Sequence, residues 1–361
     1  MSDWEKCKLG DAVTFQRGHD LPKTQMSGGI YPVAGSNGII GYHNAFTSTA
    51  KGITIGRSGN IGTPHFYKTS YWAHNTVLYI KDFKGNYQKF IYYFLKTLDF
   101  KQFNTGSAVP SLNRNHIHEL NIHIPKDIAE QKAIATVLSS LDDKIDLLHR
   151  QNNTLEAMAE TLFRQWFVEE AGEDWEIGKL GDEFDFTMGQ SPLGISFNEE
   201  GAGVPMFQGN ADFEFRFPKE RVYTTEPTRF AQRFDTLISV RAPVGAQNMA
   251  HKECCIGRGV AAFRYKNNNH YYTYTYFKLR SLMEEIKMFN DEGTVFGSIS
   301  KSDFEALEIT IPSSELIAEF EKYAKPINDK VIENCAQIYT LETLRDTLLP
   351  KLMSGEVRVA V

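Results

Sequence analysis

The most regular pattern in the chain is a heptad spacing of apolar positions between residues 127 and 168. Side chains that are apolar or small, with one asparagine, recur there at alternating steps of four and three, at Ile134, Leu138, Leu141, Ile145, Leu148, Asn152, Leu155, Ala159, Leu162 and Trp166. This spacing is typical of a coiled-coil seam, and no Gly or Pro interrupts it. The pattern predicts one helix of about 42 residues, ~60 Å long at its usual rise per residue.

The same seam returns 186 residues later, with polar breaks at Asn334 and Arg345. Its positions are Phe320, Ala324, Ile327, Val331, Asn334, Ile338, Leu341, Arg345, Leu348 and Leu352. Pro326 is expected to kink this second helix, or to make it restart near Asn328. Arg345 is expected to extend outward along its aliphatic stem.

An antiparallel pairing of the two helices would place Asn152 opposite Asn334, where two buried amides can satisfy each other. The same register pairs Leu148 with Ile338 and sets Arg345 opposite Leu141. The predicted coiled-coil residues are Leu138, Leu141, Ile145, Leu148, Asn152, Leu155, Val331, Asn334, Ile338 and Leu341. The alternative is that the two asparagines face a partner protein or water.

The remainder of the chain also contains an internal sequence repeat. WEKCKLGD at residues 4–11 recurs as WEIGKLGD at residues 175–182. Residues 104–125 align with residues 291–312, with identities at Gly106/Gly293, Ser111/Ser298, Leu120/Leu307, Ile122/Ile309, Ile124/Ile311 and Pro125/Pro312. An internal repeat of this size predicts repeated architecture. We therefore expect two globular domains, residues 1–126 and 171–312, and two long helices, residues 127–170 and 313–361.

The sequence pattern of the globular domains predicts a mixed α/β fold. The segments ITIGR, TVLYIK, TLISV and VAAFRY alternate like strands, and LNIHIP and LEITIP are short strands ended by proline. Residues 90–100 and 272–288 read as helices. The predicted fold is therefore two α/β domains in tandem repeat, separated by two long helices that form an antiparallel coiled coil with pseudo-twofold symmetry.

Composition places the chain among ordinary globular proteins. Hydrophobic residues make up 42% and charged residues 23% of the 361. No apolar run approaches the ~18 residues of a membrane span, and the charged N-terminus offers no secretion signal. The four cysteines, Cys7, Cys254, Cys255 and Cys335, lack CxxC spacing. They argue against a disulfide framework or zinc site and suit a reducing cytoplasm.

The net charge of −6 hides a strong asymmetry. Residues 1–126 hold 14 Lys and Arg against 7 Asp and Glu, together with seven of the ten histidines, whereas residues 127–174 hold 4 against 11. Residues 175–312 hold 15 against 19. Such asymmetry indicates an anionic partner for the first domain, although ordinary surface variation remains the alternative.

Sequence signatures of catalysis are missing. The chain has no GxxxxGK[ST] loop, no Asn-Pro-Pro-aromatic tetrapeptide and no GxSxG motif. His116, His118 and His123 lack metal-ligand spacing, and the Asp142-Asp143 pair reads as a solvated helix face. We predict no catalytic residue and no metal site.

Polar, basic and aromatic loops are the remaining candidates for binding. Arg can make paired hydrogen bonds to guanine, Asn and Gln can do so to adenine, and Lys binds phosphates. The predicted DNA-binding residues are Gln16, Arg17, His19, Arg57, Ser58, Asn60, Lys68, His74, Asn113, Arg114, Gln208, Asn210, Arg241, Gln247, Asn248 and Arg258. Arg57 and Arg241 are expected at equivalent places, because each follows a short apolar strand. The alternative for each residue is a structural role in a turn or an ion pair.

Three features together resemble the specificity (S) subunits of type I restriction–modification systems. The first is the repeat of a globular unit followed by a long helix. The second is the junction LNIHIPKDIAEQKAIATVLSSLDDKI with Glu130 and Gln131 in place, and the third is the pair of helix ends TLFRQWFVE and LRDTLLPKLMSGEVRV. The second helix departs from the pattern, because SSELIAEF lacks the Glu-Gln pair and Pro326 interrupts the helix.

This resemblance implies two target-recognition domains, each reading one half of a bipartite sequence in double-stranded DNA. The helices would hold these domains apart and bind two methyltransferase (M) subunits, which restriction (R) subunits would join. S-adenosylmethionine would bind the M subunits and ATP the R subunits, so no cofactor is expected in this chain. A non-enzymatic scaffold that binds carbohydrate or protein, and an enzyme with an unrecognised site, are the alternatives.

Overall fold

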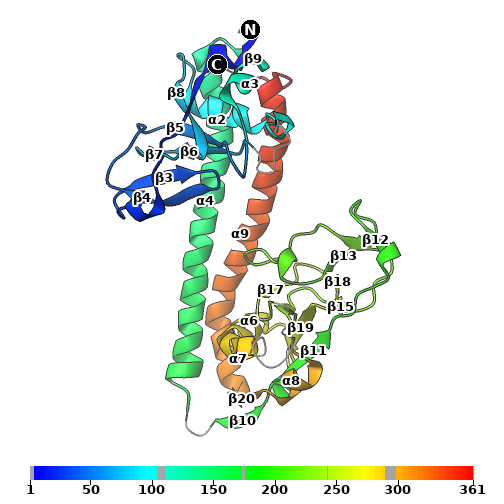
Figure 1. Cartoon of the computed structure of the whole chain (residues 1–361). Helices are drawn as coiled ribbons and strands as arrows, with labels where there is room; N and C mark the ends of the chain where they lie inside the picture. Colours follow the sequence, from blue (N-terminus) through cyan, green and yellow to red (C-terminus); the bar gives the residue numbers. More distant parts are fainter. Residues whose placement is uncertain (1–3, 104–110, 173–174, 242, 289–297, 361) are drawn as a thin grey trace. The chain divides into compact units, whose positions relative to one another are not determined.

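The computed structural model describes residues 4–103, 111–172, 175–241, 243–288 and 298–360 (Figure 1). Its contacts divide the chain into two compact units. Unit 1 comprises Met1–Asp146 together with Ile338–Val361, and unit 2 comprises Leu147–Gln337. Each long helix therefore contributes one part to each unit. Within the described ranges, no helix has both the length and the apolarity that a membrane span requires.

Unit 1 is a mixed α/β domain with three small sheets. Its elements are β1 Trp4–Lys8, α1 Leu9–Ala12, β2 Thr14–Arg17, η1 Lys23–Gln25, β3 Tyr31–Gly35, β4 Gly38–His43, β5 Gly52–Gly56, β6 Pro64–Tyr67, β7 Trp72–Ala73, β8 Val77–Asp82, α2 Gln88–Lys96, η2 Lys101–Phe103, α3 Arg114–His118 and β9 Asn121–Pro125. The strand orders are β2-β8-β5-β6, β4-β3-β7 and β1-β9.

The core of unit 1 joins this domain to the long helices. β5 is buried along its whole length, as its run of glycine and β-branched residues predicts. The apolar face of α2, with Phe90 and Phe94, packs into the same core as Ile134 and Leu138 of the first long helix and Leu352 of the second. The domain is therefore seated on its helices by apolar burial.

Unit 2 repeats this plan with longer loops. Its elements are β10 Glu176–Lys179, α5 Leu180–Glu183, β11 Phe184–Met188, η4 Gly194–Ser196, β12 Phe197–Asn198, β13 Val204–Phe207, η5 Asn210–Asp212, β14 Tyr223–Thr224, β15 Phe230–Ala231, β16 Thr236–Ser239, β17 Gln247–Met249, β18 Cys254–Ile256, β19 Val260–Tyr265, α6 Tyr272–Ser281, α7 Met283–Met288, α8 Lys301–Ala306 and β20 Glu308–Ile311. The order β11-β19-β16-β17 matches β2-β8-β5-β6, and β10-β20 matches β1-β9.

Backbone hydrogen bonds confirm the internal repeat. The amide of Arg57 donates to the carbonyl of Thr76, and the amide of Val240 donates to the carbonyl of Gly259. Likewise Gly62 donates to Gly56, and Gly245 to Ser239. Each bond recurs 183 residues later, so the two units share one backbone framework although few of their side chains agree.

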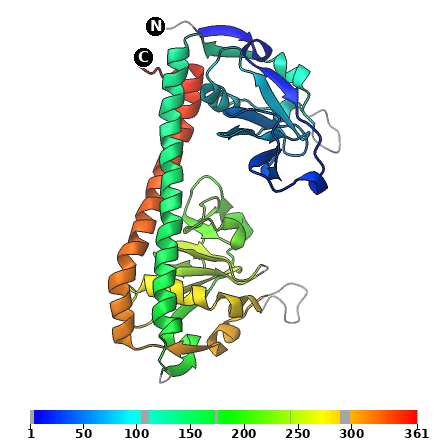
Figure 2. The same ribbon diagram turned by 90° about the vertical axis from the view of Figure 1, so that its left-hand side faces the viewer.

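The two long helices are α4 Ile128–Arg164, extended by a π-helical turn η3 Gln165–Glu169, and α9 Ser314–Ser354. Within each unit their segments run antiparallel. In unit 2 the rings of Trp166 and Phe320 lie 6.1 Å apart, and Asn152 bonds Asn334. In unit 1 Asp142 bonds Arg345. In each unit, taken by itself, the strands lie to one side of these segments (Figure 2).

The burial of the heptad positions agrees with the predicted seam. All ten predicted coiled-coil residues are buried or half-buried: Leu138, Leu141, Ile145, Leu148, Asn152, Leu155, Val331, Asn334, Ile338 and Leu341. The mixed α/β fold and the predicted strands are confirmed as well.

Several element predictions differ from the structure. The helix expected over residues 90–100 begins at Gln88 and ends at Lys96, and the one expected over 272–288 is divided into α6 and α7 at Leu282. The restart expected near Asn328 is wrong, because α9 continues through Pro326. Pro326 and Lys322 are both exposed, so water can satisfy the carbonyl that proline leaves without a donor. The aligned Gly106 and Gly293 lie outside the described residues.

The structure also shows the partners of two charged residues on the helices, and the prediction for Asp142 is wrong. Asp142 is not on a solvated face, because it accepts hydrogen bonds from the hydroxyl of Tyr93 at 2.7 Å and from Arg345 at 3.0 Å. The guanidinium of Arg345 binds Asp142 and the exposed Asp346. Ion pairing with an adjacent carboxylate explains how the seam accommodates this arginine.

Candidate nucleic-acid interface

Strand ends bring several predicted residues of unit 1 to one edge of a sheet. β8 lies between β2 and β5, with Arg17 paired to Leu78 and Gly56 paired to Val77. The ends of β2 and β5 and the start of β8 therefore share this edge. Arg17 is the last residue of β2, the loop after β5 carries Arg57 and Ser58, and Ser58 forms a bridge with Ser111.

Two arginines concentrate positive charge at this edge. Burial lowers the pKa of Arg57, and the positive charge of the nearby Arg17 lowers it further. The Nη1 of Arg57 donates a long hydrogen bond of 3.5 Å to the carbonyl of Asn75. Arg17 lies 4.0 Å from the exposed carboxylate of Asp20. A half-buried guanidinium beside a second one favours a ligand rich in negative charge or acceptors.

The other predicted residues at this edge differ in whether their side chains are already hydrogen-bonded within the protein. His19 is exposed and lies edge-on to Trp72, with ring centres 6.3 Å apart, and Gln16 is half-buried on β2. Both ring nitrogens of His74 are occupied, by the hydroxyl of Thr76 at 3.0 Å and the carbonyl of Leu21 at 3.2 Å. In this structure His74 therefore organises the loop.

Ser36 is a positioning residue that the sequence did not reveal. Its buried hydroxyl lies 2.7 Å from the carbonyl of Ser58 and 2.8 Å from that of Thr76. One hydroxyl thus binds two loops of the edge. Its only sequence signal is a place in the turn Gly-Ser-Asn-Gly between two strands, which indicates a turn and no more.

The remaining predicted residues of unit 1 lie in different settings. The side chain of Asn113 caps α3 by accepting from the amide of Asn115 at 3.0 Å, and Arg114 beside it is exposed. Asn60 is exposed in the loop that follows Arg57. Lys68 is not with them, because it follows β6, whose last residue pairs with the first residue of β5. Lys68 therefore lies at the opposite edge of the sheet.

Unit 2 forms the same edge from its matching strands. Met188 pairs with Ala261, and Ser239 pairs with Val260, so the ends of β11 and β16 meet the start of β19. The loops here carry exposed Gln208, Asn210, Arg241 and Arg258. Neither arginine has an ion pair with another residue in the described ranges.

A glycine permits the close packing of two of these loops. A Cβ built on Gly259 would lie 2.1 Å from the carbonyl oxygen of Gln208. Any side chain at this position would therefore separate the two loops. Gly18, at the corresponding edge of unit 1, is equally confined, because its Cβ would lie 2.0 Å from the carbonyl oxygen of His74.

Two predicted residues of unit 2 belong to the framework in this structure. The amide of Gln247 donates to the carbonyl of Tyr276 at 2.6 Å. Asn248 is fully buried, and its amide donates to the carbonyl of Glu214 at 2.7 Å. The sequence alone does not separate these buried amides from exposed ones such as Gln208.

The expected equivalence of Arg57 and Arg241 is wrong by one residue. Ser58 bridges Ser111, whereas Arg241 bridges Ser298, the aligned partner of Ser111. The backbone framework therefore matches Arg241 with Ser58, and Arg57 with Val240. Each unit therefore has an arginine at the corresponding edge of its sheet, but the two arginines occupy neighbouring positions of the repeated backbone framework.

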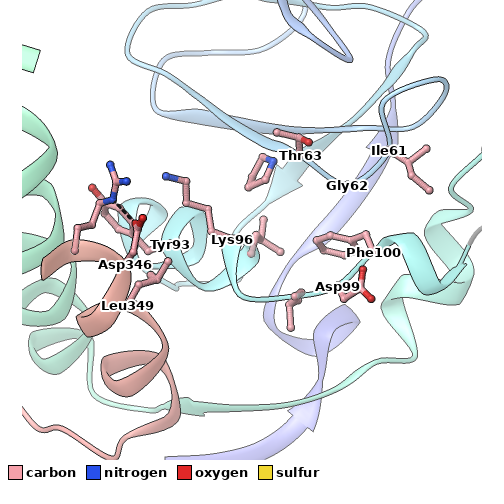
Figure 3. A pocket seen from close by; sticks show the side chains of 13 residues that line it. Ile61, Gly62, Thr63, Tyr93, Lys96, Asp99, Phe100, Asp346 and Leu349 are labelled. Carbon is pink, nitrogen blue, oxygen red and sulfur yellow. Dashed lines mark hydrogen bonds and ion pairs between the residues drawn. The ribbon is translucent and has the colours of Figure 1, made fainter. Parts of the chain in front are cut away.

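A pocket of unit 1 (Figure 3) has none of the predicted DNA-binding residues in its lining, although its lining residue Thr63 donates a hydrogen bond of 3.4 Å to Asn60. It is an open depression in unit 1, lined by Thr63, Lys96, Asp99 and residues of α9. Its charged groups include Arg345 and Asp346, which bind each other at 2.8 Å.

Comparison with known proteins identifies the family. Residues 1–157 and 172–320 match the model of the type I restriction modification DNA specificity domain. A putative type I restriction enzyme specificity subunit from Methanocaldococcus jannaschii is 33% identical over 265 residues, covering 69% of this chain and 62% of its own length. Another specificity subunit from that organism is 28% identical, covering 76% of this chain and 70% of its own.

A solved structure agrees with the fold. The S subunit of a type I restriction–modification system from M. genitalium superposes with a TM-score of 0.70 at 19% identity, covering 98% of this chain and 96% of that one. At this identity the likeness concerns the fold alone. The domain matches in both halves and the 33% identical relative show that this chain belongs to the family of type I restriction–modification specificity subunits.

Proposed function

We propose that this chain is the DNA-reading subunit of a type I restriction–modification complex and that each unit reads one half of a bipartite target in double-stranded DNA. The observation that carries the proposal is the duplicated sheet edge. The same backbone framework presents Arg17 and Arg57 in unit 1, and Arg241 and Arg258 in unit 2. Duplicated reading surfaces suit a target of two separate half-sites.

The excess of basic residues in the first 126 positions supports DNA binding. Their 14 Lys and Arg against 7 Asp and Glu would attract the phosphate backbone. Exposed amides at Asn60, Gln208 and Asn210 can supply contacts to base edges. Arginines at the edges can bind either guanine or phosphate.

We infer that the catalytic steps belong to partner subunits. Two methyltransferase subunits would bind the helices and supply S-adenosylmethionine, and restriction subunits joining that complex would supply ATP-dependent cleavage. A cytoplasmic location follows from this role. In this arrangement the present chain contributes recognition and holds no cofactor of its own.

Methylation mapping tests the proposal directly. The chain is expressed with its methyltransferase subunit in cells without other adenine methylation, and modified adenines are located by long-read sequencing. The proposal predicts methylation at one sequence made of two short half-sites with an unread spacer. Methylation at a continuous site, or none above the level given by the methyltransferase alone, would contradict it.

A further inference from the structure

Unit 2 contains a buried arginine that the reading edge does not use. Arg216 is only 1% exposed, and its guanidinium carbon lies 4.0 Å from the ring centre of Tyr276. Its Nη2 lies 3.4 Å from Oε2 of Glu156 on α4. A guanidinium is buried at high cost unless charge and ring contacts compensate it. The charge of Glu156 and the ring of Tyr276 therefore hold this side chain, since none of its guanidinium nitrogens has a hydrogen-bond partner among the described residues.

The partner carboxylate is shared between two arginines. Glu156 is itself buried, and its other oxygen binds the guanidinium of Arg280, which also lies 3.5 Å from Glu160. Arg280 would still compensate the charge of Glu156 if Arg216 were replaced. Replacement of Arg216 therefore removes a link without leaving an uncompensated buried carboxylate.

Arg216 lies at the tip of a closed loop over residues 208–222, which follows β13. At the base of the loop, the carboxylate of Asp212 accepts a hydrogen bond of 2.7 Å from the backbone amide of Gln208 and also binds the guanidinium of Arg221. Phe213 and Pro218 form a bridge that closes the loop. The predicted reading residues Gln208 and Asn210 therefore lie at one end of this loop and Arg216 at the other.

The tip of the loop is also joined to the sheet. The amide of Met249 donates to the carbonyl of Arg216 at 2.9 Å, and Asn248 donates to the carbonyl of Glu214. These bonds connect the loop to β17, whereas the side chain of Arg216 connects it to α4. The loop thus reaches from the reading edge to the long helix.

Unit 1 has no equivalent of this connection in its described residues. The strand that matches β13 is β3, since β3 pairs in parallel with β7 as β13 does with β18. β3 ends at Gly35 and β4 begins at Gly38, so only a two-residue turn follows it. This turn is held by Ser36 against neighbouring loops. The connection to α4 through a buried arginine is therefore a feature of the second domain.

We propose that Arg216 is a positioning residue for the second half-site: by binding Glu156 on α4 it fixes the loop over residues 208–222, and so the placement of Gln208 and Asn210 against DNA. This inference rests on the proposed function of the chain. It assigns to a fully buried side chain an effect on which bases are read.

The test compares two substitutions in the same loop of the full-length chain, in complex with its methyltransferase subunit. Arg216→Met removes the buried link. Lys219→Met is the matched control, because it removes a basic residue whose pair with Glu214, at 3.8 Å, is exposed. Methylation rates are measured on the target duplex and on duplexes with one base pair changed in either half-site.

Arg216→Met is expected to lower discrimination at the second half-site about tenfold, within the usual range for one mismatched base pair, and to leave the first half-site unchanged. Lys219→Met is expected to change neither discrimination ratio. A purely structural role would lower the thermal stability and the total activity without changing the ratio at one half-site alone. Arg216→Lys, which keeps the charge but lacks the planar group, provides the same comparison if Arg216→Met does not fold.

Unchanged discrimination in the folded variant, or equal losses at both half-sites, would overturn the role of Arg216. A wild-type complex that methylates no bipartite sequence would instead overturn the proposed function, and the inference with it. The wild-type result is obtained first, so the two failures are distinguishable.

Discussion

The side-chain amide of Asn334 donates a hydrogen bond of 2.9 Å to the side-chain oxygen of Asn152, and both residues are buried. The amide of Asn152 in turn lies 3.5 Å from the sulfur of Cys335. This pair joins α4 to α9 within unit 2 at the register that the heptads predict. A buried hydrogen bond between the two asparagines disfavours shifted registers, in which each side chain would lose this partner.

Replacement of one asparagine is therefore expected to be worse than replacement of both. Asn152→Leu or Asn334→Leu alone should lower the free energy of unfolding by about 1–3 kcal/mol, because the remaining amide is left unsatisfied. The double variant should recover most of this loss. Urea unfolding of the four proteins measures the effect, and additive losses in the double variant would contradict the pairing.

Disulfide trapping tests the same register by geometry. Asn152→Cys with Asn334→Cys, in a chain whose four native cysteines are replaced by serine or alanine, should form a cross-link within one chain. Asn152→Cys with Val331→Cys serves as the control for a shifted register. Efficient trapping of the control with none of the first pair would reject the arrangement.

Arg57 and Lys68 allow a matched test of the reading edge of unit 1. They lie at opposite ends of the same sheet. Arg57→Ala should weaken binding to the target duplex by about 1–3 kcal/mol and relax discrimination at one position of the first half-site. Lys68→Ala should leave that discrimination intact. Fluorescence titrations with target and singly substituted duplexes measure both effects; equal effects of the two variants would argue against this edge.

The sequence predicted what depends on repetition and on local periodicity. Ten coiled-coil positions and the Asn152–Asn334 pair followed from heptads, because burial on a helix repeats at a fixed spacing. The pairs Arg345–Asp142 and Arg216–Glu156 were not predictable, since the two members of each pair lie far apart in sequence. The role of Asn248 was not predictable either. Tertiary packing decides whether an amide side chain bonds a loop of the protein or is free to contact a base.

An ion pair between the exposed Arg358 and the buried Glu130 joins the C-terminal segment to the start of unit 1. Arg358 lies over the ring of Trp4 and donates to Glu130 at 2.7 Å, and the indole of Trp4 donates to the same oxygen at 3.2 Å. Arg358→Ala should destabilise unit 1 by about 1–3 kcal/mol, because Glu130 is buried and would lose its counter-charge.

The control for this variant is Lys351→Ala, whose pair with Glu356 is exposed and spans 3.6 Å. It should change the free energy of unfolding by less than about 0.5 kcal/mol. Thermal unfolding followed by tryptophan fluorescence compares the two proteins. If Lys351→Ala lowers the free energy of unfolding as much as Arg358→Ala does, the pair of Arg358 with the buried Glu130 contributes no more stability than an exposed pair.

Glu321 gives unit 2 a dependence on pH. This carboxyl group on α9 accepts a hydrogen bond of 2.7 Å from the amide of Tyr274 near the start of α6. Gln131 on α4 accepts in the same manner from the amide of Tyr87, at 2.8 Å. Burial raises the pKa of Glu321 from 4.5 to about 7, although the bonds from Tyr274 and Thr273 and the charge of Lys325 oppose the shift.

The sign of the effect follows from the raised pKa. Below pH 4.5 both the folded and the unfolded chain carry the proton on this carboxyl group. Between pH 4.5 and 7 the unfolded chain loses the proton first, so unfolding becomes more favourable as the pH rises. The free energy of unfolding should fall by about 3 kcal/mol from this group over that interval, and should then change no further on its account.

Glu321→Gln removes this dependence while an amide oxygen remains to accept from Tyr274, as Gln131 does from Tyr87. The variant and the wild type should be similar near pH 4.5, and the variant should be the more stable by up to about 3 kcal/mol at pH 8. Glu319→Gln, at an exposed position of the same helix, should give a curve parallel to the wild type. Urea unfolding between pH 4.5 and 8 measures the free energy of unfolding of each protein. The contributions of other titrating groups cancel in the difference between the variant and the wild type. A difference that does not change with pH for Glu321→Gln would refute the raised pKa.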